Sequence, residues 1–225
     1  MEKPPGRLGP APIRRTQSQR TGAMQERLCK ATLDVLADIG YERASTTEIC
    51  RRAGVSRGAQ THHYASKRDL ILAAYDHLLG TWEVERKRLL AAYETVPLEP
   101  ETYISFLWTK VFDTRHYIVA LELALAARGD PELQHGLQRV LSRWATMRDE
   151  IWNSRFESAD AKTDGAVFHY MTLCMLRGMT TQGDLSNHNI SNEDILAAWL
   201  DITRERMRPR GKGKARGRGK AQTTV

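Results

Sequence analysis

The fold of this chain is decided by residues 31–74, which read ATLDVLADIGYERASTTEICRRAGVSRGAQTHHYASKRDLILAA. Ser45 and Glu48 stand three residues apart, the capping-box spacing in which each side chain satisfies a free backbone amide of the other. Gly54 is suited to end the short helix that follows, and Ser56 is a good N-cap for the next one. The stretch therefore predicts two short helices joined by a tight turn.

Longer helices are predicted on both sides of this turn. From Met24 to Ile39 the apolar residues recur every three or four positions, which is the pattern of a helix with one buried stripe. Gly40 follows where a left-handed C-terminal cap is expected. On the other side, Ser66 and Asp69 repeat the capping pattern and begin a long helix that reaches toward Tyr93. The unit is a helix-turn-helix flanked by two longer helices.

Helical patterns continue from there to residue 207, with no strand alternation and no long-period repeat. Asp130 followed by Pro131 is a favoured helix start, because the missing amide of the proline needs no partner there. We expect an all-α fold, in which an N-terminal three-helix domain with the helix-turn-helix precedes a larger C-terminal helical domain. The further helices are expected near residues 101–114, 117–127, 131–156, 159–182 and 191–207.

Basic charge is concentrated at the two ends of the chain, which has 225 residues and a net charge of +7. Residues 208–225 hold seven basic side chains and no acidic one, and residues 1–20 carry +4, which leaves −4 for the middle. Both ends have too few apolar residues to offset the entropy of ordering them, so we expect disorder there. The expected parts are a disordered basic arm 1–20, the DNA-binding domain 21–70, the larger domain 71–207 and a disordered Gly/Lys/Arg tail 208–225.

Several protein classes are excluded by composition. The most apolar stretch, residues 117–127, is too short to span a bilayer and contains Glu122, and the N-terminus has no apolar segment of a secretion signal. The three cysteines, Cys29, Cys50 and Cys174, lack paired spacing, which argues against a disulfide framework or a zinc site. We therefore expect a protein of the reducing cytoplasm that has no membrane partner.

Catalytic and metal-binding patterns are also missing from the sequence. No Ser/His/Asp order, Gly-rich phosphate loop or nucleotide fingerprint occurs, so we expect neither enzyme activity nor a cofactor. Glu132 and His135 have the spacing used in di-iron bundles, but the nearest second pair, Asp113 and His116, has Asp in place of Glu. His62 and His63 are adjacent on a helix, so their side chains point about 100° apart and cannot easily share one metal ion. We expect no metal site.

The helix-turn-helix is the strongest functional signal. In such a unit the second helix enters the major groove of DNA, where its first residues meet base edges while flanking groups hold phosphates. Arg pairs with guanine, Gln pairs with adenine, and Thr or His reaches bases or phosphates. The competing interpretation is an ordinary helical hairpin with a solvated polar face. The residues expected to be exposed on the second helix are Arg57, Gln60, Thr61, His62 and His63.

The segment 27–72 resembles the N-terminal domain of TetR-type transcriptional regulators. The similarity rests on Gly-Tyr at 40–41, Thr-Thr at 46–47, the turn Ala-Gly-Val-Ser-Arg-Gly at 53–58, and His-Tyr followed by Ser-Lys-Arg-Asp-Leu within 63–70. Two positions depart from the family pattern. Gln60-Thr61 replace a frequent Leu-Tyr, which removes an aromatic phosphate contact, and Ala65 replaces a frequent Pro. The base preference therefore does not follow from the family.

The resemblance implies a role for each matching residue. Thr46 and Thr47 match positions that contact the DNA backbone, and Lys67 matches a lysine that holds a phosphate. The second helix of the motif and its cap supply the remaining contacts. The expected DNA-binding residues are Thr46, Thr47, Ser56, Arg57, Gly58, Ala59, Gln60, Thr61, His62, His63 and Lys67.

The resemblance also implies that the larger domain binds a ligand and forms a homodimer. In the family the last two long helices of each subunit, here about 159–182 and 191–207, build a four-helix bundle with those of the partner. The sequence of these two helices supports a dimer independently, because the helices carry more apolar surface than one isolated helical pair would hide. A monomer core is the competing interpretation. The expected interface residues are Met171, Cys174, Met175, Met179, Ile195, Trp199 and Ile202.

An apolar effector site is expected in the same domain. Aromatic and Met side chains adapt to a bulky ligand, although such stripes are more often plain core. The effector is expected to be a small, partly apolar molecule. The candidate lining residues are Trp108, Phe112, His116, Tyr117, Trp144, Met147, Phe168, Met171 and Met175.

Together these features predict a ligand-responsive, sequence-specific DNA-binding regulator. The resemblance favours a repressor that grips a palindromic double-stranded operator as a dimer, is released by its effector, and works at the nucleoid of a bacterium. Two alternatives remain open: a non-specific nucleic-acid binder dominated by the basic tail, and a hydrophobic-ligand-binding protein on the same fold. A tail that only improves solubility is also consistent with the sequence.

Overall fold

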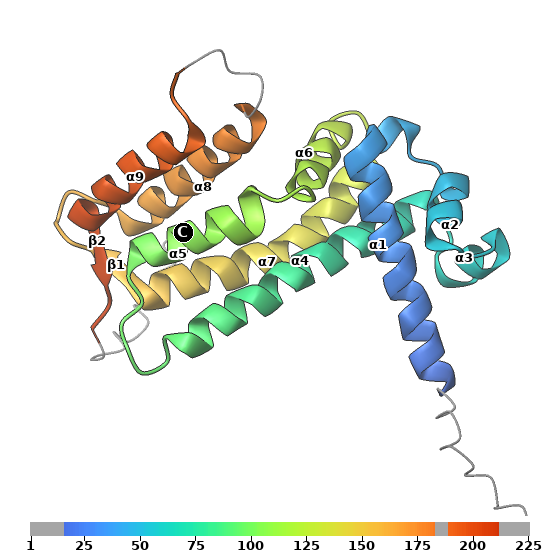
Figure 1. The fold of residues 1–225 in the computed structure, drawn as a ribbon, viewed down its shortest axis with the longest axis horizontal. Helices are drawn as coiled ribbons and strands as arrows, with labels where there is room; N and C mark the ends of the chain where they lie inside the picture. The colour runs from blue at the N-terminus through green and yellow to red at the C-terminus, as the bar shows by residue number, and fades with distance from the viewer. Residues whose placement is uncertain (1–15, 183–188, 212–225) are drawn as a thin grey trace, which may run out of the picture. The chain divides into compact units, whose positions relative to one another are not determined.

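The computed structural model describes residues 16–182 and 189–211 of the chain (Figure 1). It divides into two compact units, one ending at Leu78 and the other beginning at Leu79. The sequence predicts a boundary after residue 70, but Ile71 and Ala74, in the next turns of the same helix, are fully buried and belong to the first unit. None of the described helices is long and apolar enough to cross a membrane.

The N-terminal unit contains three helices and the start of a fourth: α1 (Gln17–Arg43), α2 (Thr46–Ala53), α3 (Arg57–His63) and α4 (Lys67–Ala92). The predicted apolar stripe of α1 is buried, with Leu28 and Val35 fully inaccessible to solvent. Ile49 of α2 is equally buried. The helix-turn-helix is therefore held on a small core of aliphatic side chains.

The first helix begins earlier and ends later than the sequence predicts. The Thr16 hydroxyl accepts a hydrogen bond from the Gln19 amide at 3.2 Å, and the Gln19 side chain accepts one from the Thr16 amide at 2.9 Å. This capping box makes residues 17–20 helical, so the expectation of a disordered arm is wrong for them, and residues 1–15 lie outside the described chain. Gly40 has φ +76°, but the chain resumes helical geometry as far as Arg43.

The C-terminal unit is also helical, which confirms the all-α fold class. After α4 come α5 (Pro100–Leu107), a π-helical turn η1 (Trp108–Phe112), α6 (Tyr117–Ala126), α7 (Pro131–Arg155), α8 (Gly165–Gln182) and α9 (Asn192–Arg206). The predicted caps are present: Asp130 accepts from the Leu133 amide, and Ser191 forms a capping box with Asp194. α8 and α9 lie side by side (Figure 1), and the rings of Phe168 and Trp199 stack between them at 5.0 Å.

A two-stranded antiparallel sheet, which the sequence does not predict, joins two distant parts of this unit. β1 (Phe156–Ser158) pairs with β2 (Met207–Pro209) in a register that sets Glu157 opposite Arg208. The expected disorder from residue 208 is therefore wrong for the strand, and residues 212–225 lie outside the described chain. The helix expected from 159 begins only at Gly165. The Asp160 carboxylate accepts the amides of Lys162 and Thr163 in a turn, and the Asp164 carboxylate accepts the amides of Ala166 and Val167 in the first turn of α8.

Candidate nucleic-acid interface

The turn of the helix-turn-helix is held by one arginine of α1. Gly54 has φ +61°, a left-handed conformation that favours glycine. The Arg27 Nη2 atom donates to the Ala53 carbonyl at 2.5 Å and to the Gly54 carbonyl at 3.0 Å. A Cβ atom at Gly54 would lie 3.1 Å from that nitrogen, so another residue would be strained by the positive φ and would also push the Arg27 guanidinium aside. The sequence analysis does not single out Arg27, whose long-range contact leaves no local pattern.

Both helices of the motif carry the predicted N-caps. The Ser45 hydroxyl accepts the Glu48 amide at 3.2 Å, and the Ser56 hydroxyl accepts the Ala59 amide at 3.1 Å. The Glu48 carboxylate, expected to complete a capping box, accepts from Arg51 and Arg52 instead. These hydrogen bonds lower the pKa of Glu48 to about 2. The Ser56 cap fixes the start of α3, and a cap of this kind stabilises a helix by about 1 kcal/mol.

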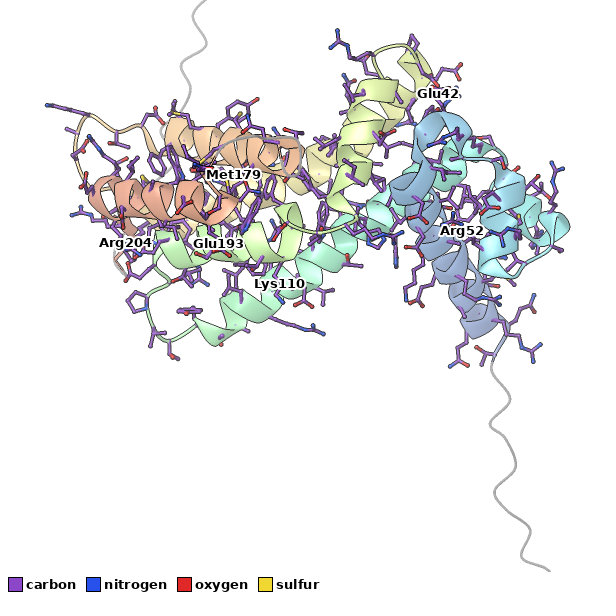
Figure 2. The ribbon with its side chains drawn as sticks, turned by 45° about the horizontal axis from the view of Figure 1, so that its top comes forward. Glu42, Arg52, Lys110, Met179, Glu193 and Arg204 are labelled. Carbon is purple, nitrogen blue, oxygen red and sulfur yellow. The ribbon has the colours of Figure 1, made fainter. Side chains whose placement is uncertain are left out.

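The basic residues of α2 are used within the fold. The Arg51 and Arg52 guanidinium groups share Glu48, and Arg52 also pairs with Asp38 of α1. Arg52 is labelled in Figure 2, where it lies in the N-terminal unit. The Arg52–Asp38 pair joins α2 to α1, while the pairs with Glu48 lie within α2. Both guanidinium groups therefore already have carboxylate partners in the fold.

Arg57 differs from these two arginines. It is exposed at the first position of α3, and its guanidinium forms no hydrogen bond or ion pair with any described residue. Gly58, Thr61 and His62 share the exposed side, as expected, while Ala59 and His63 are half-buried. The Thr61 hydroxyl donates to the Arg57 and Gly58 carbonyls and still has lone pairs free to accept. This face combines an exposed cation with short polar groups.

The expected exposure of Gln60 is wrong. Its side chain is 2% exposed, and Nε2 donates to the Tyr64 carbonyl at 3.0 Å. The last carbonyl groups of a helix lack partners within it, and the Gln60 amide satisfies one just beyond the end of α3. In this structure Gln60 therefore supports the end of the helix and presents no amide to a base edge.

The three other expected DNA contacts flank α3. Thr47 is exposed and Thr46 half-buried at the start of α2. Lys67 begins α4, donates from Nζ to the Tyr41 carbonyl at 3.1 Å and lies 4.7 Å from the Tyr41 ring centroid. Burial lowers the pKa of Lys67, and the Glu42 carboxylate acts in the opposite direction. Two ammonium protons stay available, so this anchored cation can still meet a phosphate.

Only some of the residues expected to line an effector site lie together. Trp108, Phe112, Tyr117 and Phe168 belong to one buried cluster, with Met175 packed against it. Met171 is 51% exposed. His116, Trp144 and Met147 are half-buried and do not belong to that cluster.

The expected dimer residues divide between surface and core. Met171, Cys174 and Ile202 are exposed, and Met175, Ile195 and Trp199 are half-buried. Met179, labelled in Figure 2, is 3% exposed and belongs to the buried cluster of the C-terminal unit. Val167 and Tyr170, which the sequence analysis omits, are 55% and 62% exposed on α8.

Comparison with known proteins shows which regulators this chain is similar to. Residues 28–74 match the family model described as bacterial regulatory proteins, tetR family. An uncharacterized HTH-type transcriptional regulator of Mycobacterium tuberculosis is 34% identical over 184 residues, covering 78% of this chain and 93% of the relative. The HTH-type transcriptional regulator CymR of Pseudomonas putida is 29% identical over 199 residues, covering 87% and 97%.

A solved structure supports the same fold over most of the chain. The crystal structure of a transcriptional regulator from Saccharomonospora viridis in complex with choline aligns with TM-score 0.62 and 16% identity, covering 84% of this chain and all of that one. The helix-turn-helix geometry, the family model and the full-length relatives agree. This chain therefore belongs to the TetR family of bacterial regulatory proteins and is a DNA-binding transcriptional regulator.

Proposed function

We propose that this regulator is a repressor that binds a palindromic operator as a homodimer and leaves it when a small effector binds in the C-terminal unit. The observation that carries the proposal is the exposed face of α3. There the Arg57 guanidinium has no partner among the described residues and stands beside Thr61 and His62. A cation that the fold does not use is suited to guanine or to phosphate.

The proposed dimer forms through α8 and α9. Val167, Met171 and Cys174 of α8 and Ile202 of α9 leave apolar surface exposed. In a dimer the two α3 helices must sit about 34 Å apart to enter successive major grooves on one face of the operator. An effector releases DNA when it binds a conformer with a different spacing more tightly. The shift that it causes between the two conformers cannot exceed its difference in affinity for them.

The comparisons support the ligand-responsive part of this proposal. The regulator from Saccharomonospora viridis was determined in complex with choline, so a protein of this fold takes a small molecule. The named relatives are transcriptional regulators, which favours regulation over enzyme activity. We place the action of this chain on the bacterial chromosome, in the cytoplasm.

Selection of genomic fragments tests the proposal. The full chain and a chain ending after Gly211 are each incubated with fragments of the source genome at about 150 mM salt, where non-specific phosphate contacts are weakened. Gly211 is chosen because it keeps β2 intact. The expected result is that both enrich the same short palindrome. Enrichment without any motif, or DNA binding only by the full chain, contradicts sequence-specific regulation and favours the basic tail as the binding element.

A matched pair of variants then tests the α3 face. Arg57→Ala is expected to weaken binding to the selected palindrome about tenfold or more, as the loss of a bidentate base contact does. Arg139→Ala removes an exposed arginine of α7 in the C-terminal unit and serves as the control. Equal affinities for the two variants would remove Arg57 from the DNA interface.

A further inference from the structure

Gln60 is a polar side chain at a core position that an apolar residue could fill. It is 2% exposed, although Arg57 and Thr61 on the same helix are exposed. Burying an amide is unfavourable unless its polar atoms are hydrogen-bonded, whereas a methionine or leucine side chain is buried without that cost. The presence of glutamine here is therefore explained by the bonds that its amide makes.

The Gln60 amide joins the last turn of α3 to the residue that follows the helix. Its Nε2 atom donates to the Tyr64 carbonyl at 3.0 Å, and the Tyr64 backbone amide donates to the Gln60 carbonyl at 2.9 Å. The two residues are thus bonded in both directions. Since only residues 64–66 separate α3 from α4, this pair fixes how α3 meets the connection to α4.

Tyr64 is itself held on α1. Its hydroxyl shares a hydrogen bond with the sulfur atom of the buried Cys29, at 3.5 Å. α1 also holds the opposite end of α3, because Arg27 donates to two carbonyl groups of the turn that precedes that helix. α3 is therefore tied to α1 at both ends, and the tie at its C-terminal end passes through Gln60.

Lys67, the other cation expected to meet DNA, is fixed on the same helix. Its Nζ atom donates to the Tyr41 carbonyl of α1 at 3.1 Å, and the Ser66 hydroxyl caps α4 by accepting the Asp69 amide at 3.0 Å. α1 therefore supports both Lys67 and α3. Because α3 has only seven residues and so little stability of its own, the spacing between Arg57 and Lys67 depends on these tertiary bonds.

We propose that Gln60 is a positioning residue for operator recognition, which acts without touching DNA. It holds the exposed face of α3 at the spacing from Lys67 that lets both meet one duplex. Without the Gln60 amide the end of α3 shifts, and Arg57 and Lys67 no longer reach their sites together. Non-specific binding needs only positive charge near phosphates, so it does not depend on this spacing. The inference rests on the proposed DNA contacts of Arg57 and Lys67.

Gln60→Met tests the proposal, because methionine is a long unbranched side chain that cannot donate a hydrogen bond. Binding of the full chain to the selected palindrome and to a scrambled duplex of the same length is followed by fluorescence anisotropy at about 150 mM salt. The Kd for the palindrome is expected to rise about tenfold, as for a lost base contact, while the Kd for the scrambled duplex changes by less than about twofold. Gln138→Met, at an exposed glutamine of α7, is the matched control and leaves both Kd values unchanged.

The cost of Arg57→Ala distinguishes positioning from a loss of folded protein. In the unchanged chain this substitution is expected to weaken binding to the palindrome about tenfold. In the Gln60→Met chain it is expected to cost less than about twofold, because Arg57 no longer reaches its site. A purely structural role of Gln60 lowers the folded fraction of both proteins alike. The tenfold cost would then persist in both chains, which overturns the proposal.

Tyr64→Phe is a second variant, which keeps Gln60 and removes only the hydroxyl that meets Cys29. The ratio of the two Kd values, scrambled duplex over palindrome, is expected to fall about threefold, since one weak hydrogen bond to α1 is lost. An unchanged ratio in both Tyr64→Phe and Gln60→Met overturns the proposal. If Gln60→Met does not melt cooperatively, the ratio measured for Tyr64→Phe decides alone.

The proposed function and this inference fail in different measurements. If Arg57→Ala has no effect in the unchanged chain, the proposed DNA contact of Arg57 is wrong, and the inference fails with it. A chain that selects a palindrome through Arg57 but tolerates Gln60→Met retains its proposed function and contradicts the inference alone.

Discussion

Gly58 stands on the exposed face of α3 where the fold does not require glycine. Its φ is not in the left-handed region, and a Cβ atom there would meet only the Ser56 hydroxyl, at 4.0 Å. Alanine is favoured over glycine in a helix by about 0.5–1 kcal/mol. Gly58→Ala is therefore expected to raise the free energy of unfolding by that amount in urea titrations, while weakening operator binding because the added methyl group keeps the α3 backbone away from DNA.

The matched stability control is Gly22→Ala in α1, where a Cβ atom also meets nothing within 4 Å. A stabilised Gly58→Ala protein that binds operator as tightly as the unchanged chain would show that the α3 backbone does not approach DNA at this residue.

His169 makes the stability of the protein depend on pH. Burial first, and then Arg148, lower its pKa to about 4, whereas in the unfolded chain the pKa is about 6.5. Between these values the unfolded state binds a proton that the folded state does not. The contribution of His169 to the free energy of unfolding is therefore fully present above pH 6.5 and is lost as the pH falls toward 4. The loss is about 2 kcal/mol at pH 5.

Urea unfolding at pH 7 and pH 5 checks this difference against His169→Phe, which cannot titrate and keeps an aromatic ring beside Trp152. Other groups contribute equally to both proteins. Between pH 7 and pH 5 the free energy of unfolding should therefore fall by about 2 kcal/mol less in the variant than in the unchanged chain. Identical losses would mean that His169 takes up its proton equally in both states.

At the scale of elements, local signals were sufficient for the helices and insufficient for the sheet. Ser45, Ser56 and Asp130 cap helices as predicted, because a cap depends on residues three apart. β1 and β2 are three residues each, and their partners lie far apart in the chain, as Glu157 and Arg208 do. Such short strands carry no alternation to detect, and only the folded helices bring them together.

The sheet gives the C-terminal segment a structural role. Met207 is 3% exposed, and Arg210 donates to the Phe156 carbonyl at 3.1 Å. A chain ending after Arg206 loses this buried side chain and the whole of β2, so it should be less stable by about 3 kcal/mol. A chain ending after Gly211 keeps both and should unfold in urea like the full chain. Equal stability of the two shortened chains would show that β2 adds nothing measurable.

At the scale of the whole molecule, the DNA-binding part could be predicted from sequence far better than the effector part. Arg57 directly follows the N-cap Ser56, so its place at the start of α3 can be predicted locally, whereas the buried orientation of Gln60 depends on a carbonyl beyond the helix end. The buried aromatic cluster that holds Trp108, Tyr117 and Phe168 takes these side chains from η1, α6 and α8. No local spacing marks such a cluster, since only packing shows which side chains meet.

The exposed apolar stripe of α8 leads to the last prediction. Val167, Tyr170, Met171 and Cys174 follow one another at helical spacings of three, one and three residues, and all are exposed. If two copies pair there, Met171→Glu places a charge in the apolar interface and the protein should sediment as a monomer with unchanged helical content.

The matched control is Leu125→Glu, a change at a 64% exposed apolar residue of α6, which should remain dimeric. The Met171→Glu monomer should also bind the palindromic operator far more weakly, because the binding free energies of two linked α3 helices combine, whereas a monomer has only one. A Met171→Glu protein that sediments as a dimer would place the subunit contact elsewhere on the chain. If it is monomeric yet binds the full palindrome undiminished, each α3 helix reads its half-site independently of the dimer.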